Sequence, residues 1–432
     1  MPPESPAARP PLVSVVVPTY NRRELLRRTL ESLADQTVPT ARFEVVVADD
    51  GSTDDTRAMV ESFKDRLRIQ YYYQEDDGFR AARARNEGAR LAEAPVLAFL
   101  DTGVLAGPGY VESLHGAHHR AADGGADRTD LAILGYTYGY NRFDPFPGLG
   151  ELLAGLSPQQ AVDRLGADPR FRDMRHERFA QVEFELNRLV APWFLFWTMN
   201  VSVTAAAFWA VSGFDEDFRG WGLEDVELGY RLARHGVRID VARAAWAVDV
   251  PHERSTGTDS TSVLRNAELF LAKHPEPVPE MLWARYAHAS RASVEDMCRE
   301  LARWTEDCRD RDVSPELAEA RAGIAGDGSS RPRIAVFGCG HGVPSGWPPC
   351  TLVDFDLELL RSAPSDYGRH TLIHAIGLRT PCPDGAFDLV IVSSRLAGLW
   401  ERWGQDVLAE ALRIGATVSV PFLDADAAGR TT

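Results

Sequence analysis

The chain has 432 residues, enough for two or three domains, and 44% of them are hydrophobic while 25% are charged. Its formal net charge is −16, from 47 Lys and Arg against 63 Asp and Glu. An acidic chain without a basic block is a poor candidate for binding nucleic acid through phosphates, so we expect no nucleic-acid partner.

The first hundred residues alternate between buried-strand and amphipathic-helix patterns. Residues 1–11 lack the basic-then-apolar order of a secretory signal and are predicted to be a disordered leader. The β-branched run LVSVVVP at 12–18 is typical of a strand buried on both faces. Further strands are expected at 43–48, 68–73 and 95–100, and helices at 22–33, 54–63 and 79–93. We expect Ser52 or Thr53 to cap the second helix. This order predicts an α/β fold with an open, mostly parallel sheet and flanking helices.

The rest of the chain is less regular. Residues 120–190 contain a Pro/Gly loop at 141–150 and a charged stretch at 168–189 that we interpret as helical. The weakly charged run 191–214 contains Pro192 and Asn200, which favour a buried strand, turn and helix over a transmembrane segment. We therefore expect no transmembrane segment. The expected domains are a first domain at 12–257, a helical extension and linker at 258–325, and a small α/β unit at 331–432.

All five cysteines lie in the second half of the chain, and none forms a CxxC pair. An odd number of cysteines argues against a disulfide framework. We therefore predict a reducing, cytoplasmic setting.

Carboxylates follow two of the predicted strands. In an open parallel sheet, ligands bind outside the carboxyl ends of the strands. Asp49 and Asp50 follow the strand at 43–48, and Asp101 ends the strand at 95–100. The first pair suits a base or a ribose hydroxyl, and Asp101 suits a divalent cation that bridges two phosphates. Both segments are also good turn sequences, and these residues alone leave that alternative open.

Two later segments carry further candidates. Trp221 and Gly222 precede the paired acids Glu224 and Asp225 at the expected start of a helix. Paired acids can cap a helix, or one can bind a hydroxyl while the other takes its proton. His252 follows about thirty residues later in PHE, where a neutral imidazole could complete an oxygen-rich metal site or serve a structural role.

Taken in order, these motifs resemble the family-2 inverting glycosyltransferases of the GT-A fold. The motifs are VSVVVPTYNR, FEVVVADDGSTD, GFRAARARNEG, FLDTG, GFDEDFRGWGLEDVELGYRL and PHE, spread over residues 12–254. The second half of this region looks most like the galactosyltransferase-type region of chondroitin-polymerase-type enzymes. The resemblance implies a Rossmann-like GT-A domain that transfers a sugar with inversion from a nucleotide diphosphate-sugar, such as a UDP- or dTDP-sugar, to a hydroxyl acceptor.

The resemblance also implies roles for individual residues. Asp225 is expected to be the general base, with Glu224 beside it on the acceptor. The expected donor-binding residues are Pro18, Tyr20, Asp49, Asp50, Arg85, Asn86 and Asp101. The expected acceptor-binding residues are Asn200, Trp221, Gly222 and Glu224. Asp101 and His252 are the expected ligands of a divalent metal, Mn²⁺ or Mg²⁺.

The chain departs from the family at the metal motif. Gly103 stands where the family usually has a second acid, so DxD has become DTG. This substitution leaves the metal requirement open. It also keeps a non-catalytic sugar-nucleotide-binding scaffold as an alternative.

The C-terminal unit resembles a class I methyltransferase in IAVFGCGHG (334–342), TLVDFD (351–356) and PDGAFDLVIVSS (383–394). Eight residues, 343–350, separate the glycine turn from the next strand, too few for a crossover helix. We expect a shortened, non-catalytic relative that serves packing or homodimer formation, and S-adenosylmethionine is not an expected cofactor. A bifunctional glycosyl- and methyltransferase is the competing hypothesis.

Overall fold

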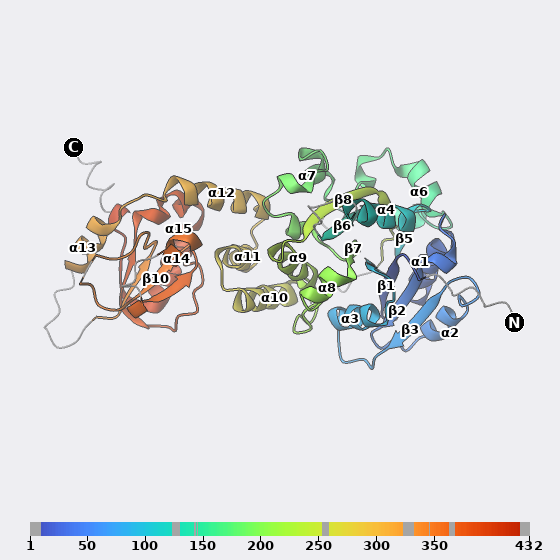
Figure 1. The fold of residues 1–432 in the computed structure, drawn as a ribbon, viewed down its shortest axis with the longest axis horizontal. Coiled ribbons are helices and arrows are strands. Elements are labelled where there is room, and N and C mark those ends of the chain that lie inside the picture. Colours follow the sequence, from blue (N-terminus) through green and yellow to red (C-terminus); the bar gives the residue numbers. More distant parts are fainter. Residues whose placement is uncertain are drawn as a thin grey trace, which may run out of the picture. The chain divides into compact units, whose positions relative to one another are not determined.

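The computed structural model describes residues 10–122, 130–141, 144, 146–252, 259–322, 332–344, 346–362 and 368–423. The chain divides into two compact units, residues 1–266 and 267–432 (Figure 1). Each unit has its own sheet, of eight strands in the first and five in the second.

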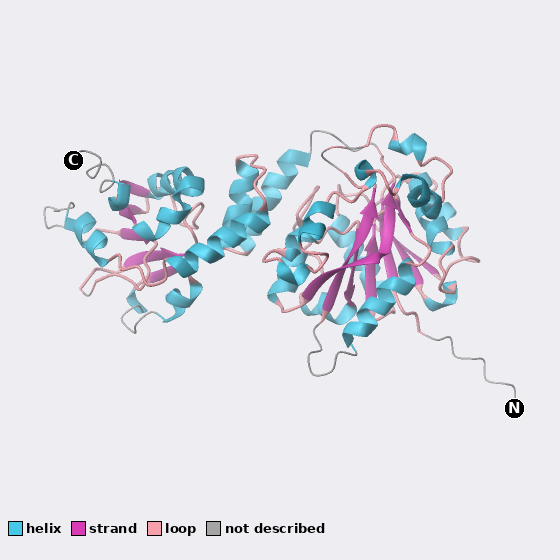
Figure 2. Cartoon of the chain, turned by 90° about the horizontal axis from the view of Figure 1, so that it is seen from above, coloured by secondary structure: helices cyan, strands magenta, loops and turns pink. Residues whose placement is uncertain are grey.

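The first half of the first unit follows the predicted alternation of strands and helices. Its elements are β1 (Ser14–Thr19), α1 (Arg23–Ala34), β2 (Glu44–Asp49), α2 (Thr56–Glu61), β3 (Ile69–Tyr73), α3 (Ala81–Leu91) and β4 (Val96–Leu100). Strands β3, β2, β1 and β4 are neighbours in that order and all pair in parallel. Most residues of β1, β2 and β4 are buried because helices cover both faces of this sheet (Figure 2). Their carboxyl ends meet at one edge, as expected.

The second half of this unit extends the sheet with mixed pairing. Its elements are β5 (Val104–Ala106), α4 (Tyr110–Ala122), β6 (Leu131–Tyr138), α5 (Leu149–Leu152), α6 (Pro158–Leu165), α7 (His176–Gln181), β7 (Asn200–Thr204), α8 (Ala205–Ala210), α9 (Glu224–Arg234) and β8 (Arg238–Asp249). Strand β7 runs antiparallel to β4, with Asn200 opposite Leu100, and β5 runs antiparallel to β8, with Val104 opposite Asp249. Because of these two pairings, the first residue of β7 and the segment that follows β8 both lie next to the turn after β4.

Two local predictions are wrong. Neither Ser52 nor Thr53 caps α2: the Ser52 hydroxyl accepts a hydrogen bond from the backbone N–H of Asn21, and α2 begins only at Thr56. The stretch 168–189 is not one helix. It contains the 3₁₀ turns Pro169–Phe171 and Leu186–Arg188 around the six-residue α7. Charged composition favoured a helix there, but Phe171, Phe179 and Leu186 are each fully buried and anchor separate turns.

The weakly charged run 191–214 forms a 3₁₀ turn (Pro192–Leu195), β7 and α8. The expected buried strand and helix are present, but the turn precedes the strand, and α8 follows β7 directly. Among the described residues, no helix is both long enough and apolar enough to cross a membrane.

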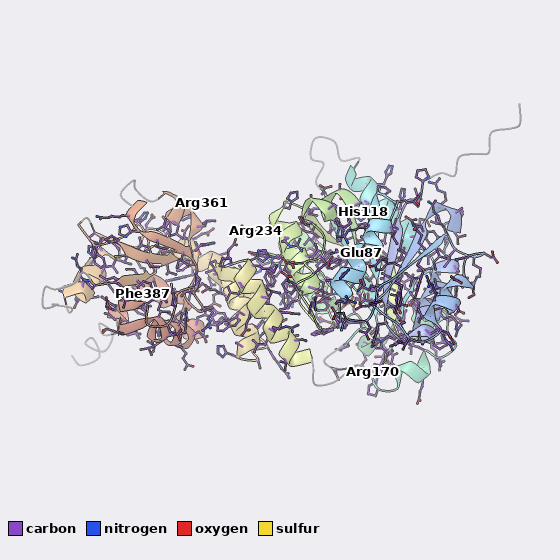
Figure 3. The ribbon with its side chains drawn as sticks, turned by 90° about the horizontal axis from the view of Figure 1, so that it is seen from below. Glu87, His118, Arg170, Arg234, Arg361 and Phe387 are labelled. Carbon is purple, nitrogen blue, oxygen red and sulfur yellow. The ribbon has the colours of Figure 1, made fainter. Side chains whose placement is uncertain are left out.

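The second unit is a helical segment followed by a parallel sheet. Helix α10 (Asp259–Lys273) crosses the boundary between the units, and α11 (Pro277–Ala287), α12 (Val294–Asp307) and α13 (Ser314–Ala322) follow. The remaining elements are β9 (Ile334–Phe337), β10 (Cys350–Asp354), α14 (Leu357–Ser362), β11 (Thr371–His374), β12 (Phe387–Val392), a 3₁₀ helix (Ser394–Leu399), α15 (Trp400–Ile414) and β13 (Gly415–Ser419). The strand order is β11-β10-β9-β12-β13, and Phe387 marks the start of β12 in Figure 3. In the described residues between β9 and β10 there is no helix, in line with the shortened connection.

Candidate active site

Asp49 and Asp50 have different surroundings at the end of β2. The Asp49 carboxylate accepts hydrogen bonds from the backbone N–H of Ser52 at 2.7 Å and from the Tyr71 hydroxyl at 2.6 Å, so it shapes the turn. The Asp50 carboxylate accepts from the Gln74 side-chain amide at 2.5 Å and from the backbone N–H of Arg80 at 2.7 Å. Burial raises the pKa of Asp50. Asp50 is therefore held where β2, β3 and α3 converge.

Tyr20 presents a half-exposed ring beside the same loop. Its side chain is 45% exposed, and its hydroxyl donates to the Asp76 carboxylate at 2.8 Å. That hydrogen bond raises the pKa of Tyr20. An exposed ring with its hydroxyl tied down is suited to stacking on a flat ligand. Pro18 lies on β1, and its carbonyl accepts from the Thr102 hydroxyl at 2.8 Å, which links β1 to the DTG turn.

Arg85 connects two carboxylates that are far apart in the sequence. It lies on α3 and is 4% exposed. One terminal nitrogen donates to Asp101 at 2.8 Å and the other to Glu224 at 3.2 Å. Burial acts to lower the pKa of Arg85, but the charges of Asp101 and Glu224 outweigh it and raise the pKa. The end of β4 and the start of α9 are thus joined through one guanidinium group.

The paired acids begin α9 after a constrained turn. Gly222 has φ +101°, and Leu223 has φ +73°, a left-handed conformation that residues with side chains rarely adopt. Glu224 is 7% exposed, and within the described part of the chain its Oε2 atom is buried without a hydrogen-bond partner. Buried polar atoms are normally paired, so this oxygen suits a donor group from a ligand.

Asp225 is half-buried beside Glu224. Its carboxylate accepts from the backbone N–H groups of Val226 at 2.8 Å and Thr198 at 3.2 Å. Burial, and then the charge of Glu224, raise the pKa of Asp225, the charge of Arg85 lowers it, and the net result is a pKa of about 7. A carboxyl group that titrates near neutral pH is suited to accept a proton as a general base.

The DTG turn meets the segment after β8. The carbonyl of Asp101 accepts from the backbone N–H of Val104 at 3.0 Å, and that of Gly103 accepts from Val250 at 3.0 Å. A Cβ atom built on Gly103, which has φ +95°, would lie 3.8 Å from Nδ1 of His252. Gly103, which stands where the family usually has its second acid, therefore lies next to His252.

Asp101 and His252 are the candidate metal ligands. The Asp101 side chain is 37% exposed, and one of its oxygens is bound by Arg85. Among the described residues, no group of three or more His, Cys, Asp and Glu side chains is placed to hold a metal ion. Two protein ligands fit Mg²⁺ or Mn²⁺ when waters and substrate phosphates complete the coordination shell. The residues present therefore fit a metal that arrives with a diphosphate better than a closed protein site.

Two predicted site residues have structural contacts. The Asn86 side chain donates to the carbonyl of Phe214 at 2.9 Å and accepts from its backbone N–H at 2.9 Å, so it clamps that residue. Asn200 is fully buried inside the sheet, where its amide donates to the carbonyl of Ala245 at 3.2 Å and a Cβ atom on Gly135 would overlap it. Their expected ligand contacts remain predictions.

The turn before α9 is held by side chains of α10. The carbonyl of Trp221 accepts from the Ser262 hydroxyl at 2.9 Å, and that of Gly222 accepts from the Asn266 amide at 2.7 Å. Trp221 itself is partly exposed at the start of this turn. The contacts of Asn266 and of Gln74, which holds Asp50, were missed by sequence reasoning because neither residue lies in a recognisable motif.

In the C-terminal unit, an internal ion pair fills the space beside the glycine turn. Asp354, at the end of β10, accepts from the backbone N–H of Gly340 at 2.7 Å and from Nε of Arg395 at 3.1 Å. Both side chains are fully buried. A Cβ atom on Gly340 would lie 2.9 Å from Cδ of Arg395. The arginine also donates to the backbone carbonyls of Cys308 and Arg309, just after α12.

Both family models that match this chain match residues of the first unit, which carries the candidate site. Residues 14–143 match the model of glycosyl transferase family 2, and residues 180–253 match that of the N-terminal domain of galactosyltransferase. Two validoxylamine A glucosyltransferases from Streptomyces hygroscopicus, subspecies limoneus and jinggangensis, are 47% and 46% identical to this chain. Each alignment covers 96% of this chain, and 91% and 98% of the respective relative. Chondroitin synthase of Escherichia coli is 29% identical over 57% of this chain and 35% of its own length.

The fold, the carboxylate arrangement and these similarities define a glycosyltransferase. The chain belongs to glycosyl transferase family 2, with a galactosyltransferase-type segment in the second half of its first unit. The expected family, enzyme class and GT-A fold are confirmed.

Proposed function

We propose that this enzyme transfers a glucosyl group from a nucleotide diphosphate-glucose to a hydroxyl group of validoxylamine A or a close analogue, with inversion at the anomeric carbon. Identity of 47% and 46% over almost the whole chain supports this donor sugar and acceptor. The observation that carries the proposal is the pair of acids at the start of α9. The pKa of Asp225 is raised to about 7, and Arg85 donates hydrogen bonds to both Glu224 and Asp101.

The reaction is one in-line displacement. Asp225 takes the proton of the acceptor hydroxyl, and that oxygen forms a bond to the anomeric carbon. The bond from this carbon to the β-phosphate oxygen breaks, and the nucleoside diphosphate leaves with the electron pair. In this proposal Glu224 accepts a hydrogen bond from the acceptor, and its buried, unpartnered Oε2 atom supports this role. General-base catalysis of this kind typically contributes about 10²–10⁴-fold in rate.

The donor is bound on the other side of this carboxylate cluster. Asp50 and the exposed ring of Tyr20 suit the base, and Asp101 suits the ribose or the diphosphate. When bound, a divalent cation held by Asp101 and His252 would neutralise the charge of the departing diphosphate. The DTG turn supplies one acid there instead of two, so binding of the cation should depend strongly on the nucleotide.

The full-length chain should be incubated with validoxylamine A and UDP-, dTDP- or GDP-glucose, with Mn²⁺ or with EDTA. We expect a glucosylated product by mass spectrometry, and NMR should show the anomeric configuration opposite to that of the donor. Retained configuration would refute inversion. Donor hydrolysis without transfer would refute the acceptor alone, and neither reaction with any donor would refute the proposed activity.

The activity should depend on pH through Asp225. Because its pKa is raised to about 7 and the base must be deprotonated, kcat/KM should level off above pH 7. Below it, kcat/KM should fall about tenfold per pH unit. A pH–rate profile at constant ionic strength checks this. Glu224→Gln removes the charge that raises this pKa, so its acid limb should move to lower pH. A flat wild-type profile between pH 5 and 8 would contradict the assignment of the base.

For the C-terminal unit we propose a structural role without methyl transfer. In the methyltransferase resemblance, the glycine turn and the acid after the second strand form the cofactor site. In this chain the acid, Asp354, is paired with Arg395, and the arginine packs against Gly340. Calorimetry with S-adenosylmethionine should show no binding heat at millimolar ligand, whereas saturable binding would support a bifunctional enzyme.

A further inference from the structure

Arg85 has surroundings that distinguish it from a simple phosphate-binding arginine. It lies on the buried side of α3, while Glu87 and Arg90 of the same helix pair with each other at 2.6 Å nearer the surface (Figure 3 labels Glu87). The Arg85 guanidinium also lies 5.6 Å from the ring centre of Phe214. The clamp by Asn86, the next residue on α3, fixes the backbone of Phe214. Two neighbouring residues of one helix therefore hold the group and the ring it packs on.

Both terminal nitrogens of the guanidinium are already bound to carboxylates. One terminal nitrogen bonds to Asp101 and the other to Glu224, and in the described structure Nε is buried without a partner. Arginine presents its donors in a rigid planar fork, so occupying both ends fixes the positions of both carboxylates. Because Arg85 is only 4% exposed and both terminal nitrogens carry a carboxylate, a diphosphate that bound here would compete with those carboxylates for a buried charge, which is costly.

The charges of the cluster lead to the same conclusion. Asp101, Glu224 and Asp225 bring three carboxyl groups together, and Arg85 is the cation that the structure places among them. Without it, Glu224 would be a nearly buried carboxylate without a counterion, and its side chain would be expected to turn toward solvent. The unpartnered Oε2 atom of Glu224 would then no longer be held in place.

We propose that Arg85 is a positioning residue for the transfer reaction: it holds the acceptor-side acid Glu224 and the donor-side acid Asp101 at a fixed separation, and it does not bind the diphosphate. This inference rests on the proposed function. It differs from the family-based expectation, in which Arg85 contacts the donor phosphates or ribose.

A positioning role and a donor-binding role of Arg85 predict different kinetics for its variants. Because the bridge orders the acceptor side and the base, Arg85→Gln should lower kcat about 100-fold or more and raise the KM for the acceptor. The Kd for the nucleoside diphosphate should change less than about threefold. Arg85→Lys should recover part of kcat, because a lysine ammonium keeps the charge but cannot grip two carboxylates in a planar fork.

Arg83→Gln is the matched control, since Arg83 is exposed on the same helix two residues earlier, and it should behave like the wild type. Circular dichroism and melting curves establish that each variant is folded. If Arg85→Gln does not fold, a kinetic double-mutant cycle of Arg85→Lys with Glu224→Gln replaces it. The double variant should lose less activity than the product of the single losses, because both substitutions break one unit.

The inference is overturned if the Kd for nucleoside diphosphate weakens in parallel with the loss of kcat/KM, or if the cycle is additive. Turnover by the wild type shows whether the proposed function or only the inference about Arg85 has failed. If the wild type transfers no sugar while nucleotide binding still distinguishes Arg85→Gln from Arg83→Gln, Arg85 is a phosphate ligand and both proposals fail. If the wild type is active and the Arg85 variants keep full kcat, the inference alone fails.

Discussion

Replacing Asp225 with asparagine should lower kcat for glucosyl transfer by about 10²–10⁴-fold while leaving nucleotide binding within about threefold of the wild type. Asparagine keeps the size of the side chain but cannot accept a proton at neutral pH. Its amide oxygen can still accept from the backbone N–H of Thr198 or Val226, which hold the aspartate. The start of α9 should therefore keep its conformation, and the loss should lie in the chemical step.

The measurement is steady-state transfer together with calorimetric binding of the nucleoside diphosphate. Asp65→Asn makes the same chemical change at an exposed position after α2 and should have no effect on either quantity. Full activity in Asp225→Asn would remove the base assignment, and the neighbouring Glu224 would then be the acid to test. Loss of nucleotide binding together with activity would show that Asp225 acts in holding the donor side of the site.

The half of the candidate site formed by Asp50 and Asp101 could be predicted largely because its geometry follows from local patterns. Buried β-branched runs define parallel strands, and parallel strands place their carboxyl ends at one edge of a sheet. Asp50 and Asp101 follow two such strands, and the structure places both at that edge. What the pattern could not distinguish was Asp49 from Asp50, because their contacts depend on Tyr71, which lies on the next strand, and on Gln74, which directly follows it.

The half of the candidate site around Glu224 was less predictable because long-range strand pairing builds it. The link from Arg85 to Glu224 spans 139 residues, and it forms because β7 inserts antiparallel beside β4. Helical spacing alone does not show which face of α3 meets the start of α9. Strand β7 also pairs with β6, which places Asn200 inside the sheet against Gly135. No local signal distinguishes that position from one facing a ligand.

The C-terminal unit should lose about 3–5 kcal/mol of stability when Asp354 is replaced by asparagine, because Arg395 then remains buried without its counterion. The pair is fully buried, and its arginine also donates to carbonyls after α12, so the charge cannot reach water without disturbing the helical segment. Hydrogen exchange followed by mass spectrometry, read separately for the second unit, measures the change without assuming two-state unfolding of the whole chain.

Arg333→Gln is the contrasting control, since Arg333 pairs with Asp388 at 2.9 Å but both side chains are about half exposed. Exposed pairs contribute about 0–1 kcal/mol, so this variant should exchange like the wild type. Because the first unit carries its own sheet and core, Asp354→Asn should alter exchange in β9 and β10 before it alters glucosyl transfer. If Asp354→Asn is as stable as the wild type, the stability of the second unit does not depend on the ion pair between Asp354 and Arg395. The acid beside the glycine turn would then be available to a ligand, which is the condition that a methyltransferase site requires.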